Sequence, residues 1–180
     1  MPAPIIVNLM QHDPAWADQA RREGDRLMAA TGDAILAVHH IGSTAIPGIC
    51  AKPVLDLIPV IRGLDSFDAS RSIIEDLGYA WWGEYGLPGR RYCTFDDPWS
   101  GGRLVQLHCF EQDSPEITRH LAFRDYLQSH PEMAREYEIE KIRCRDLYPD
   151  NSHAYSDCKA SWIRRIEEQA LSARARRRNQ

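Results

Sequence analysis

A single carboxylate interrupts an otherwise apolar segment of the chain. Asp56 stands in the middle of Pro53 to Ile61, PVLDLIPVI, which has the length and composition of a buried strand. An unpaired carboxylate in such a strand is energetically expensive, so a partner is expected. Two interpretations follow. Asp56 either forms an ion pair with Lys52 or an arginine inside the fold, or it is a metal or substrate ligand on the face of the sheet.

A glycine and two hydroxyl residues, Gly42-Ser43-Thr44, directly follow a second apolar segment, Ala34 to Ile41. At the end of a strand, such a turn can surround an anion with backbone N–H groups and hydroxyl donors. A tight turn with a Ser or Thr cap explains the same residues equally well. The sequence contains neither GxxxxGK[ST] nor GxGxxG, so the turn is not a Walker loop or a dinucleotide-binding fingerprint.

Histidine and arginine side chains near these segments supply further candidates. His39 and His40 are adjacent on the first predicted strand, so at most one of them faces a cleft. Arg90 and Arg91 follow the turn GLPG and are either bidentate phosphate clamps or exposed charges at a strand edge. His108, in RLVQLHCF, is either a ligand that suits Zn²⁺ or Mn²⁺ better than Mg²⁺, or a satisfied core residue.

Charged residues elsewhere have the same two kinds of interpretation. Lys52 precedes the strand that bears Asp56 and is expected to pair with this carboxylate or with a phosphate. Arg124 and Asp125 lie in the segment FRDY, and Lys159 lies on the last predicted helix. These three residues either form ion pairs that dock a helical half of the chain on the sheet, or contact a phosphorylated substrate.

The periodicity of apolar residues and the positions of capping and helix-breaking residues predict the elements that must position these residues. A helix is expected from Asp13-Pro14 to about Ala30. A second helix is expected from about Asp65 to Leu77, and short strands with turns over residues 79 to 110. Helix restarts at Ser114-Pro115 and continues, with breaks at residues 130–131 and near 149.

This order predicts an α+β or α/β core with a helical C-terminal half; of the two we expect α+β, a mixed sheet flanked by helices. We expect one domain over residues 1–180, with the sheet in about 1–112 and a helical half in about 113–173. The arginines within residues 174–180 are expected to form a solvated or disordered tail, with a nucleic-acid-binding arm as the alternative.

Composition narrows the class of protein further. A formal net charge of -4 argues against nucleic acid as a partner, because duplex-binding proteins normally carry a basic excess. No apolar run approaches the roughly 18 residues of a membrane span, and no signal peptide is recognisable. Five widely spaced cysteines without a CxxC pair predict free thiols rather than a disulfide framework or a zinc ribbon. These features favour a cytoplasmic protein.

Three segments resemble the signatures of the GrpB family. Residues 40–56, HIGSTAIPGICAKPVLD, are similar to the family's HIGSTAVPGLAAKPIID. Residues 120–141, HLAFRDYLQSHPEMAREYEIEK, resemble LxFRDYLRxHPExAxxYxxLK, and AYSDCKASWI, which contains Tyr155 and Lys159, resembles AYxxxKxxFI. The resemblance spans residues from about 14 to 170 and favours His40 over His39 as the histidine that faces a site.

The resemblance implies the fold of the polymerase-β-like nucleotidyltransferase superfamily. That superfamily carries a Gly-Ser pair after its first core strand, which Gly42 and Ser43 match, and a Dx[DE] motif whose first carboxylate is matched by Asp56. Two carboxylates two residues apart on a strand face the same side and can hold Mg²⁺ against a triphosphate. This chain departs from the pattern, because Ile58 replaces the second carboxylate and the candidate third strand offers Gln106 and His108.

The resemblance therefore implies that a nucleotide or another phosphorylated small molecule binds in a cleft between sheet and helices. Gly42, Ser43 and Thr44 are expected to hold phosphate, and Asp56 to hold at most one divalent cation, Mg²⁺ or Mn²⁺. The remaining charge is expected from His108, His40, Lys52 and an arginine. The implied reaction is metal-dependent nucleotidyl transfer. The alternative is a non-catalytic accessory, chaperone-like or binding module that has lost the complete metal site; the oligomeric state stays open.

Overall fold

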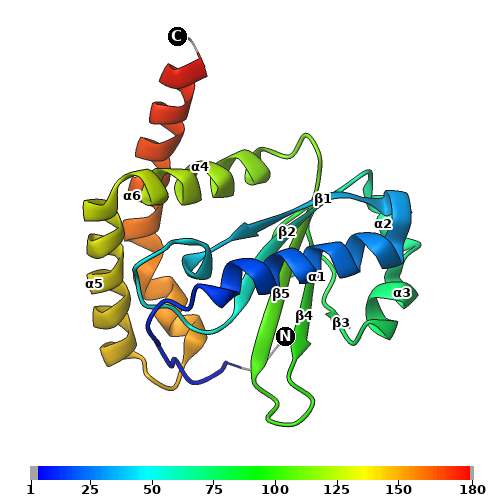
Figure 1. Ribbon diagram of the computed structural model, residues 1–180, viewed down its shortest axis with the longest axis horizontal. Coiled ribbons are helices and arrows are strands. Elements are labelled where there is room, and N and C mark those ends of the chain that lie inside the picture. The colour runs from blue at the N-terminus through cyan, green and yellow to red at the C-terminus, as the bar shows by residue number, and fades with distance from the viewer. Residues whose placement is uncertain (1–3, 179–180) are drawn as a thin grey trace.

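A five-stranded sheet lies between helices in the computed structural model, which describes residues 4–178 (Figure 1). The strands are β1 (Ile35–Ile41), β2 (Leu55–Ile61), β3 (Ala80–Trp81), β4 (Arg91–Asp96) and β5 (Arg103–Glu111). Their order across the sheet is β1-β2-β5-β4-β3, and β2 pairs with β5 in parallel while all other neighbours are antiparallel. The expected class, α+β with a mixed sheet flanked by helices, is confirmed.

One face of the sheet is covered by helix α1 (Ala15–Thr31). As expected from Asp13, its carboxylate accepts a hydrogen bond of 2.9 Å from the N–H of Ala15 at the start of this helix. Gly24 disfavours helix by propensity, but a Cβ at this position would stand 3.1 Å from the Cβ of Val38 on β1. The glycine therefore allows α1 to pack closely against the sheet. A 3₁₀ turn over Gly32–Ala34 leads into β1.

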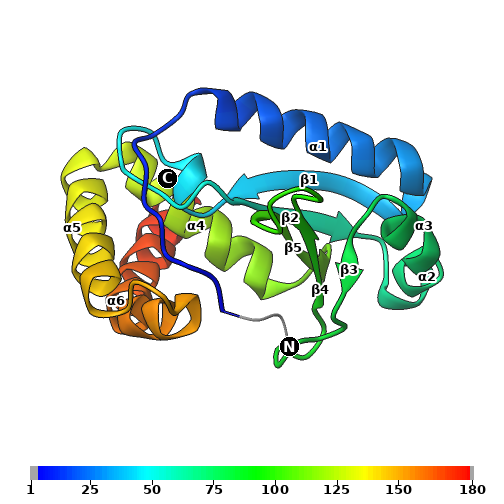
Figure 2. The same cartoon turned by 90° about the horizontal axis from the view of Figure 1, so that it is seen from below.

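The opposite face is covered by helix α4 (Pro115–Ser129), as Figure 2 shows. Successive side chains of β2 and β5 point to opposite faces of the sheet, so each face has its own apolar core. Leu57 and Leu107 point to the α1 side, whereas Ile58 and Phe110 point to the α4 side and pack with Ile117. Asp56 lies on the same face as Ile58, so the carboxylate is on the α4 side of the sheet.

The helical half consists of α4, α5 (Pro131–Leu147) and α6 (Ser152–Arg178). The connection between β1 and β2, which includes a 3₁₀ turn over Ser43–Ala45, inserts Ile46 and Ile49 between these helices. The buried ammonium group of Lys141 donates to the carbonyl of Cys50, and the carboxylate of Glu138 accepts a hydrogen bond of 2.6 Å from the N–H of Cys50. These contacts anchor the connection to α5.

The helix predicted from Asp65 to Leu77 is wrong in one respect, because the structure divides it into α2 (Leu64–Asp68) and α3 (Arg71–Asp76). Ser70 lies at the break, and its hydroxyl donates to the carbonyl of Ser66 at 3.3 Å. Such local hydrogen bonds compete with continuous helix. The break allows both Phe67 and Ile74 to be fully buried.

Two further expectations require correction. Helix α6 continues to Arg178, so the arginines up to this residue are helical rather than a disordered tail, and residues 179–180 lie outside the described residues. In Figure 1 the last turns of α6 extend beyond the other helices. Cys144 and Cys158 form a disulfide between α5 and α6, so the prediction of free thiols holds for Cys50, Cys93 and Cys109. The pairing follows from the contact of these two helices.

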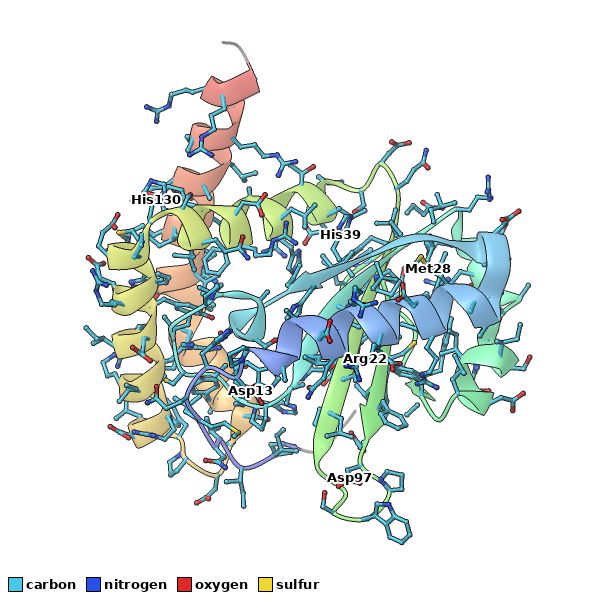
Figure 3. All side chains as sticks on the ribbon, viewed as in Figure 1. Asp13, Arg22, Met28, His39, Asp97 and His130 are labelled. Atoms are coloured by element: carbon cyan, nitrogen blue, oxygen red, sulfur yellow. A yellow bond between two sulfur atoms is a disulfide. The ribbon has the colours of Figure 1, made fainter. Side chains whose placement is uncertain are left out.

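The predicted strands and helix breaks otherwise agree with the structure. The hairpin between β4 and β5 turns at Asp97, labelled in Figure 3, and α4 and α5 are separated at His130. Across residues 4–178, no helix combines the length and the apolar character that are needed to cross a bilayer.

Candidate functional site

A cavity of about 480 Å³ lies where the sheet meets the C-terminal helices. Its wall combines the β1–β2 connection, strands β2, β4 and β5, and helices α5 and α6. The volume is in the range of small-molecule sites. The predicted site residues that line this cavity are Gly42, Ser43, Thr44, Lys52, Asp56, Arg90, His108 and Lys159.

Asp56 is placed in this wall by the register of two neighbouring strands. It pairs with Ile41 on β1 and with Gln106 on β5, and its carboxylate lies 3.7 Å from the ring of His108. Burial alone would raise the pKa of the Asp56 carboxyl. Its contact with His108 and the positive charges of Lys52 and Lys159 outweigh burial and hold the pKa below its ordinary value. Asp56 is therefore an anion at neutral pH.

The turn after β1 requires glycine at position 42. Gly42 has a φ of 72°, a left-handed conformation that side-chain-bearing residues rarely adopt. A Cβ at this position would also collide with the carboxylate of Asp56. The glycine therefore allows the turn to pack directly against Asp56, and it places Ser43 in the cavity wall beside the hydroxyl of Tyr137.

Thr44 is held by contacts with β1 and with the residue that precedes β2. Its hydroxyl lies 2.8 Å from Nε2 of His40 and donates weakly to the carbonyl of Val54 at 3.5 Å. Burial lowers the pKa of His40 to about 4, so the imidazole is neutral at physiological pH. His40 does not line the cavity. In this position it contacts Thr44, and its carbonyl accepts a hydrogen bond from Arg124, while a contact of His40 with substrate stays a prediction.

Two lysines reach the cavity from distant parts of the chain. Lys52 comes from the segment before β2 and Lys159 from α6, and their ammonium groups lie 5.5 Å and 4.2 Å from the ring centroid of Tyr155. Burial lowers the pKa of each lysine to about 8, and the charge of Asp56 limits the shift. Within residues 4–178, neither ammonium group forms an ion pair or a hydrogen bond with another side chain. Both charges are thus available to a ligand.

Arg90 stands at the β4 side of the cavity and is held by backbone carbonyls. Its guanidinium donates to the carbonyl of Tyr85 at 2.6 Å and to that of Glu84 at 3.2 Å, and it lies 3.4 Å from Nδ1 of His108. It also stands over the ring of Tyr92 at 5.1 Å. Burial lowers the pKa of Arg90, yet arginine stays charged at all physiological pH values. Arg90 is thus a fixed cation in the wall.

Two further predicted substrate contacts lie outside the cavity. Arg91 forms a bidentate pair with Asp68, with both distances 2.6 Å, so it links β4 to α2. Arg124 donates to the carbonyl of His40 at 3.0 Å and pairs with the neighbouring Asp125. These contacts support the structural interpretation of Arg124, because they dock α4 on β1.

His39 is likewise on the α4 side of β1 at the point labelled in Figure 3, and it is absent from the cavity wall. Its pKa is lowered by burial and by the nearby charge of Arg124. The favoured choice between the two adjacent histidines, His40, lies behind the turn rather than in the cavity.

Several residues of the cavity wall are not among the predicted site residues. Tyr137, Tyr155 and Arg103 line the cavity together with Ser152 and Asp157. A usable signal existed on the last helix, where positions 152, 155, 156 and 159 recur at the spacing of one helical face. Tyr137 had no comparable signal, because it reaches the cavity only when α5 packs beside α6.

The donor set around Asp56 does not fit a two-metal centre. Ile58, the next position on this face of β2, is fully buried against Phe110 and Ile117 and offers no ligand. On β5, Gln106 stands opposite Asp56 and contributes a neutral amide whose oxygen accepts a hydrogen bond of 2.7 Å. Paired divalent cations need several carboxylates to balance their charge, and this face supplies one.

A second group of side chains that could ligate a metal lies outside the cavity. The group of such side chains found within residues 4–178 is Glu140, Cys144 and Cys158, and both cysteines are committed to the disulfide. A single Mg²⁺ or Mn²⁺ at Asp56 stays a prediction, although Lys52 and Lys159 would oppose a cation there.

The family model described as "GrpB protein" matches residues 6–169. The chain belongs to the GrpB family. It is 37% identical over 175 residues to the UPF0157 protein YqkA of Bacillus subtilis (strain 168), covering 96% of this chain and 50% of YqkA. It thus spans about half the length of that relative. The crystal structure of a conserved protein GrpB from Enterococcus faecalis has a TM-score of 0.85 and 34% identity, covering 92% of this chain and 98% of that one.

A more distant likeness concerns the fold. The structure of Cid1 in complex with its short product ApU has a TM-score of 0.54 and 11% identity, covering 82% of this chain and 48% of the Cid1 chain. At this identity the likeness shows the fold alone, and it agrees with the nucleotidyltransferase-like sheet predicted from the sequence.

Proposed function

We propose that this protein binds a nucleotide or another phosphorylated small molecule in the cavity between the sheet and the C-terminal helices. The observation that carries the proposal is the charge of the wall, where Lys52, Arg90 and Lys159 face a glycine-hydroxyl turn. These three side chains are partly buried, and cations withdrawn from water without a direct carboxylate partner are costly unless an anion compensates them. A phosphate group offers several acceptor oxygens and matches these donors.

The balance of charges supports an anionic ligand. The cavity is lined by four cationic side chains, Lys52, Arg90, Arg103 and Lys159, and by two carboxylates, Asp56 and Asp157. Arg103 pairs with Asp96 on the neighbouring strand, so the other three cations remain for a ligand. An excess of positive charge inside a partly closed cavity attracts anions more strongly than the same charges on an open surface.

Nucleotidyl transfer is the reaction that the fold suggests. ApU, named as the short product of Cid1, joins two nucleosides through one phosphate. In such a reaction an acceptor hydroxyl attacks the α-phosphorus of a nucleoside triphosphate, pyrophosphate leaves, and the proton of the hydroxyl passes to a base. Asp56, ionised and packed against Gly42, is the residue we assign to accept this proton.

A non-catalytic binding role is the second candidate. The burial of Ile58 in an apolar cluster favours it, because the carboxylate that metal-assisted transfer needs at this position is replaced by a core side chain. Both candidate functions use the same phosphate site, and they differ in whether the protein converts the bound ligand.

Two adjacent arginines provide a matched test of the shared site. Arg90→Gln removes a cation from the cavity wall, whereas Arg91→Gln removes the same charge from the pair with Asp68 outside it. We expect isothermal titration with nucleotides, coenzyme A precursors and sugar phosphates to identify a ligand whose affinity falls at least about tenfold in Arg90→Gln. Arg91→Gln should bind it like the wild type. Equal affinity in both variants would refute the assignment of the cavity.

Turnover separates the two candidates. Wild-type protein incubated with a nucleoside triphosphate, an acceptor alcohol and Mg²⁺ should release pyrophosphate if transfer occurs, and Asp56→Asn should not. Ligand binding without pyrophosphate release from any acceptor supports the non-catalytic role.

A further inference from the structure

We infer that the ammonium groups of Lys52 and Lys159 take the place of metal ions in this cavity, so that its phosphorylated ligand binds as a metal-free polyanion. The inference rests on the proposed function and names the charge carriers of that same site. It also changes the role of Asp56, which becomes the counter-ion of two lysines instead of a metal ligand.

The sheet face around Asp56 carries little negative charge. Beside Asp56, the positions that would complete a cation site are Ile58, buried in the core, and Gln106, a neutral amide held by the hydroxyl of Tyr92 at 2.7 Å. One carboxylate cannot balance two divalent cations. The same carboxylate can balance one of two ammonium groups, which leaves a positive charge for the ligand.

The two lysines converge on one aromatic ring. Lys52 and Lys159 both lie over the ring of Tyr155, at 5.5 Å and 4.2 Å from its centroid, and Lys159 also lies 5.9 Å from the ring centroid of Tyr137. The aromatic faces support the ammonium groups without neutralising them. Both lysines are close enough to Asp56 for its charge to act on them. A cation bound at Asp56 would be repelled by both.

The segment that leads to Lys52 is anchored by hydrogen bonds. Its neighbours Ala51 and Cys50 are fixed, because Ala51 forms a two-way backbone bridge with Met10 at 2.9 Å and Cys50 is bound at both its N–H and its carbonyl by α5. The backbone that carries Lys52 is thus fixed by the fold, and its ammonium group lies 5.5 Å from the ring centroid of Tyr155. Preorganised charge of this kind favours binding of an anion.

The two roles of Asp56 predict opposite effects of Asp56→Asn. If Asp56 holds a metal that carries the phosphate, the substitution abolishes binding. If Asp56 is the counter-ion of two lysines, the substitution removes a competing anion and strengthens phosphate binding. Asp125→Asn is the matched control, because it changes net charge equally on a carboxylate that pairs with Arg124 and Arg174 outside the cavity.

The experiment titrates inorganic pyrophosphate into the full chain by calorimetry at pH 7, in EDTA and in excess MgCl₂. We expect binding in EDTA, at least about tenfold weaker binding in Lys52→Met and in Lys159→Met, and tighter binding in Asp56→Asn but not in Asp125→Asn. Far-ultraviolet circular dichroism checks that each variant is folded. If a lysine variant fails to fold, the sign of the Asp56→Asn effect alone decides the question.

Titration of Mn²⁺ alone, followed by the electron paramagnetic resonance signal of the free ion, should show no binding to the wild type. Pyrophosphate binding that requires Mg²⁺ and disappears in Asp56→Asn would overturn this inference and leave the proposed function standing. No pyrophosphate binding in either buffer, together with no binding of the phosphorylated compounds tested above, would overturn both.

Discussion

Raising the pH from 7 to 9 should release a phosphorylated ligand from the cavity. In the free protein, burial lowers the pKa of Lys52 and of Lys159 to about 8. Each lysine binds an anion in its protonated form. Affinity should therefore be constant well below pH 8 and fall as the pH rises above it, because the ammonium groups lose their protons.

The size of the effect follows from the number of lysines. With a pKa of about 8, the protonated share of each lysine falls from about nine-tenths at pH 7 to about one-tenth at pH 9. If both ammonium groups are needed, the dissociation constant rises about 100-fold over this range. Loss of one lysine should reduce the rise to about tenfold, so Lys159→Met provides the internal control.

A phosphate monoester is the appropriate probe, because its second ionisation near pH 6 is already about nine-tenths complete at pH 7 and changes little up to pH 9. Other groups of the wall contribute little to the profile. Burial raises the pKa of Tyr92 and of Tyr155 far above pH 9, and the carboxylate of Asp56 is ionised throughout. Calorimetric dissociation constants at closely spaced pH values measure the effect. A flat profile between pH 7 and 9 would refute the conclusion that the lysines carry the binding.

Three further predictions concern stability. Replacing Cys144 and Cys158 by serine should lower the free energy of unfolding by about 3 kcal/mol, because the disulfide joins residues that are 14 positions apart in the chain. Calorimetry under oxidising conditions should show a lower melting temperature for the variant. Equal melting temperatures of the variant and the wild type would contradict this prediction. Lys159→Met should raise the ligand-free melting temperature at pH 7 and lose the rise at pH 10, since its folded pKa, about 8, lies below the unfolded one. Gly42→Ala should destabilise by about 1–3 kcal/mol in urea titration, through a φ of 72° and a collision with a carboxylate. Gly48→Ala, with a φ of 79° and open space around it, measures the conformational part alone, and an equal loss in both variants would exclude the collision.

Local patterns predicted most of the elements correctly. The apolar segments before Gly42 and around Asp56 are strands β1 and β2, and the Pro131 break separates α4 from α5 as expected. The candidate third strand that offers Gln106 and His108 is β5. Such features depend on neighbouring residues and on backbone geometry, which the sequence displays directly.

The same local patterns were insufficient where distant segments meet. Arg90 and Arg91 are adjacent and chemically equal in the sequence, yet the first is in the cavity wall and the second pairs with Asp68 on α2. The disulfide was missed for a related reason. Cys144 and Cys158 are on different helices, and their contact requires α5 and α6 to pack side by side.

By itself, the amino-acid sequence determined the family and the α+β class. It also singled out the residues whose types and positions suggest chemistry, Asp56 and the Gly42-Ser43 turn. Only the tertiary structure decided which charges accompany them. Lys52 precedes β2 and Lys159 lies on the last helix, and they meet at Tyr155 because the first turns of α6 line the same cavity as the sheet. Electrostatic interactions act through space, whereas sequence patterns record proximity along the chain, so the charge of a site emerges only when distant elements have been assembled.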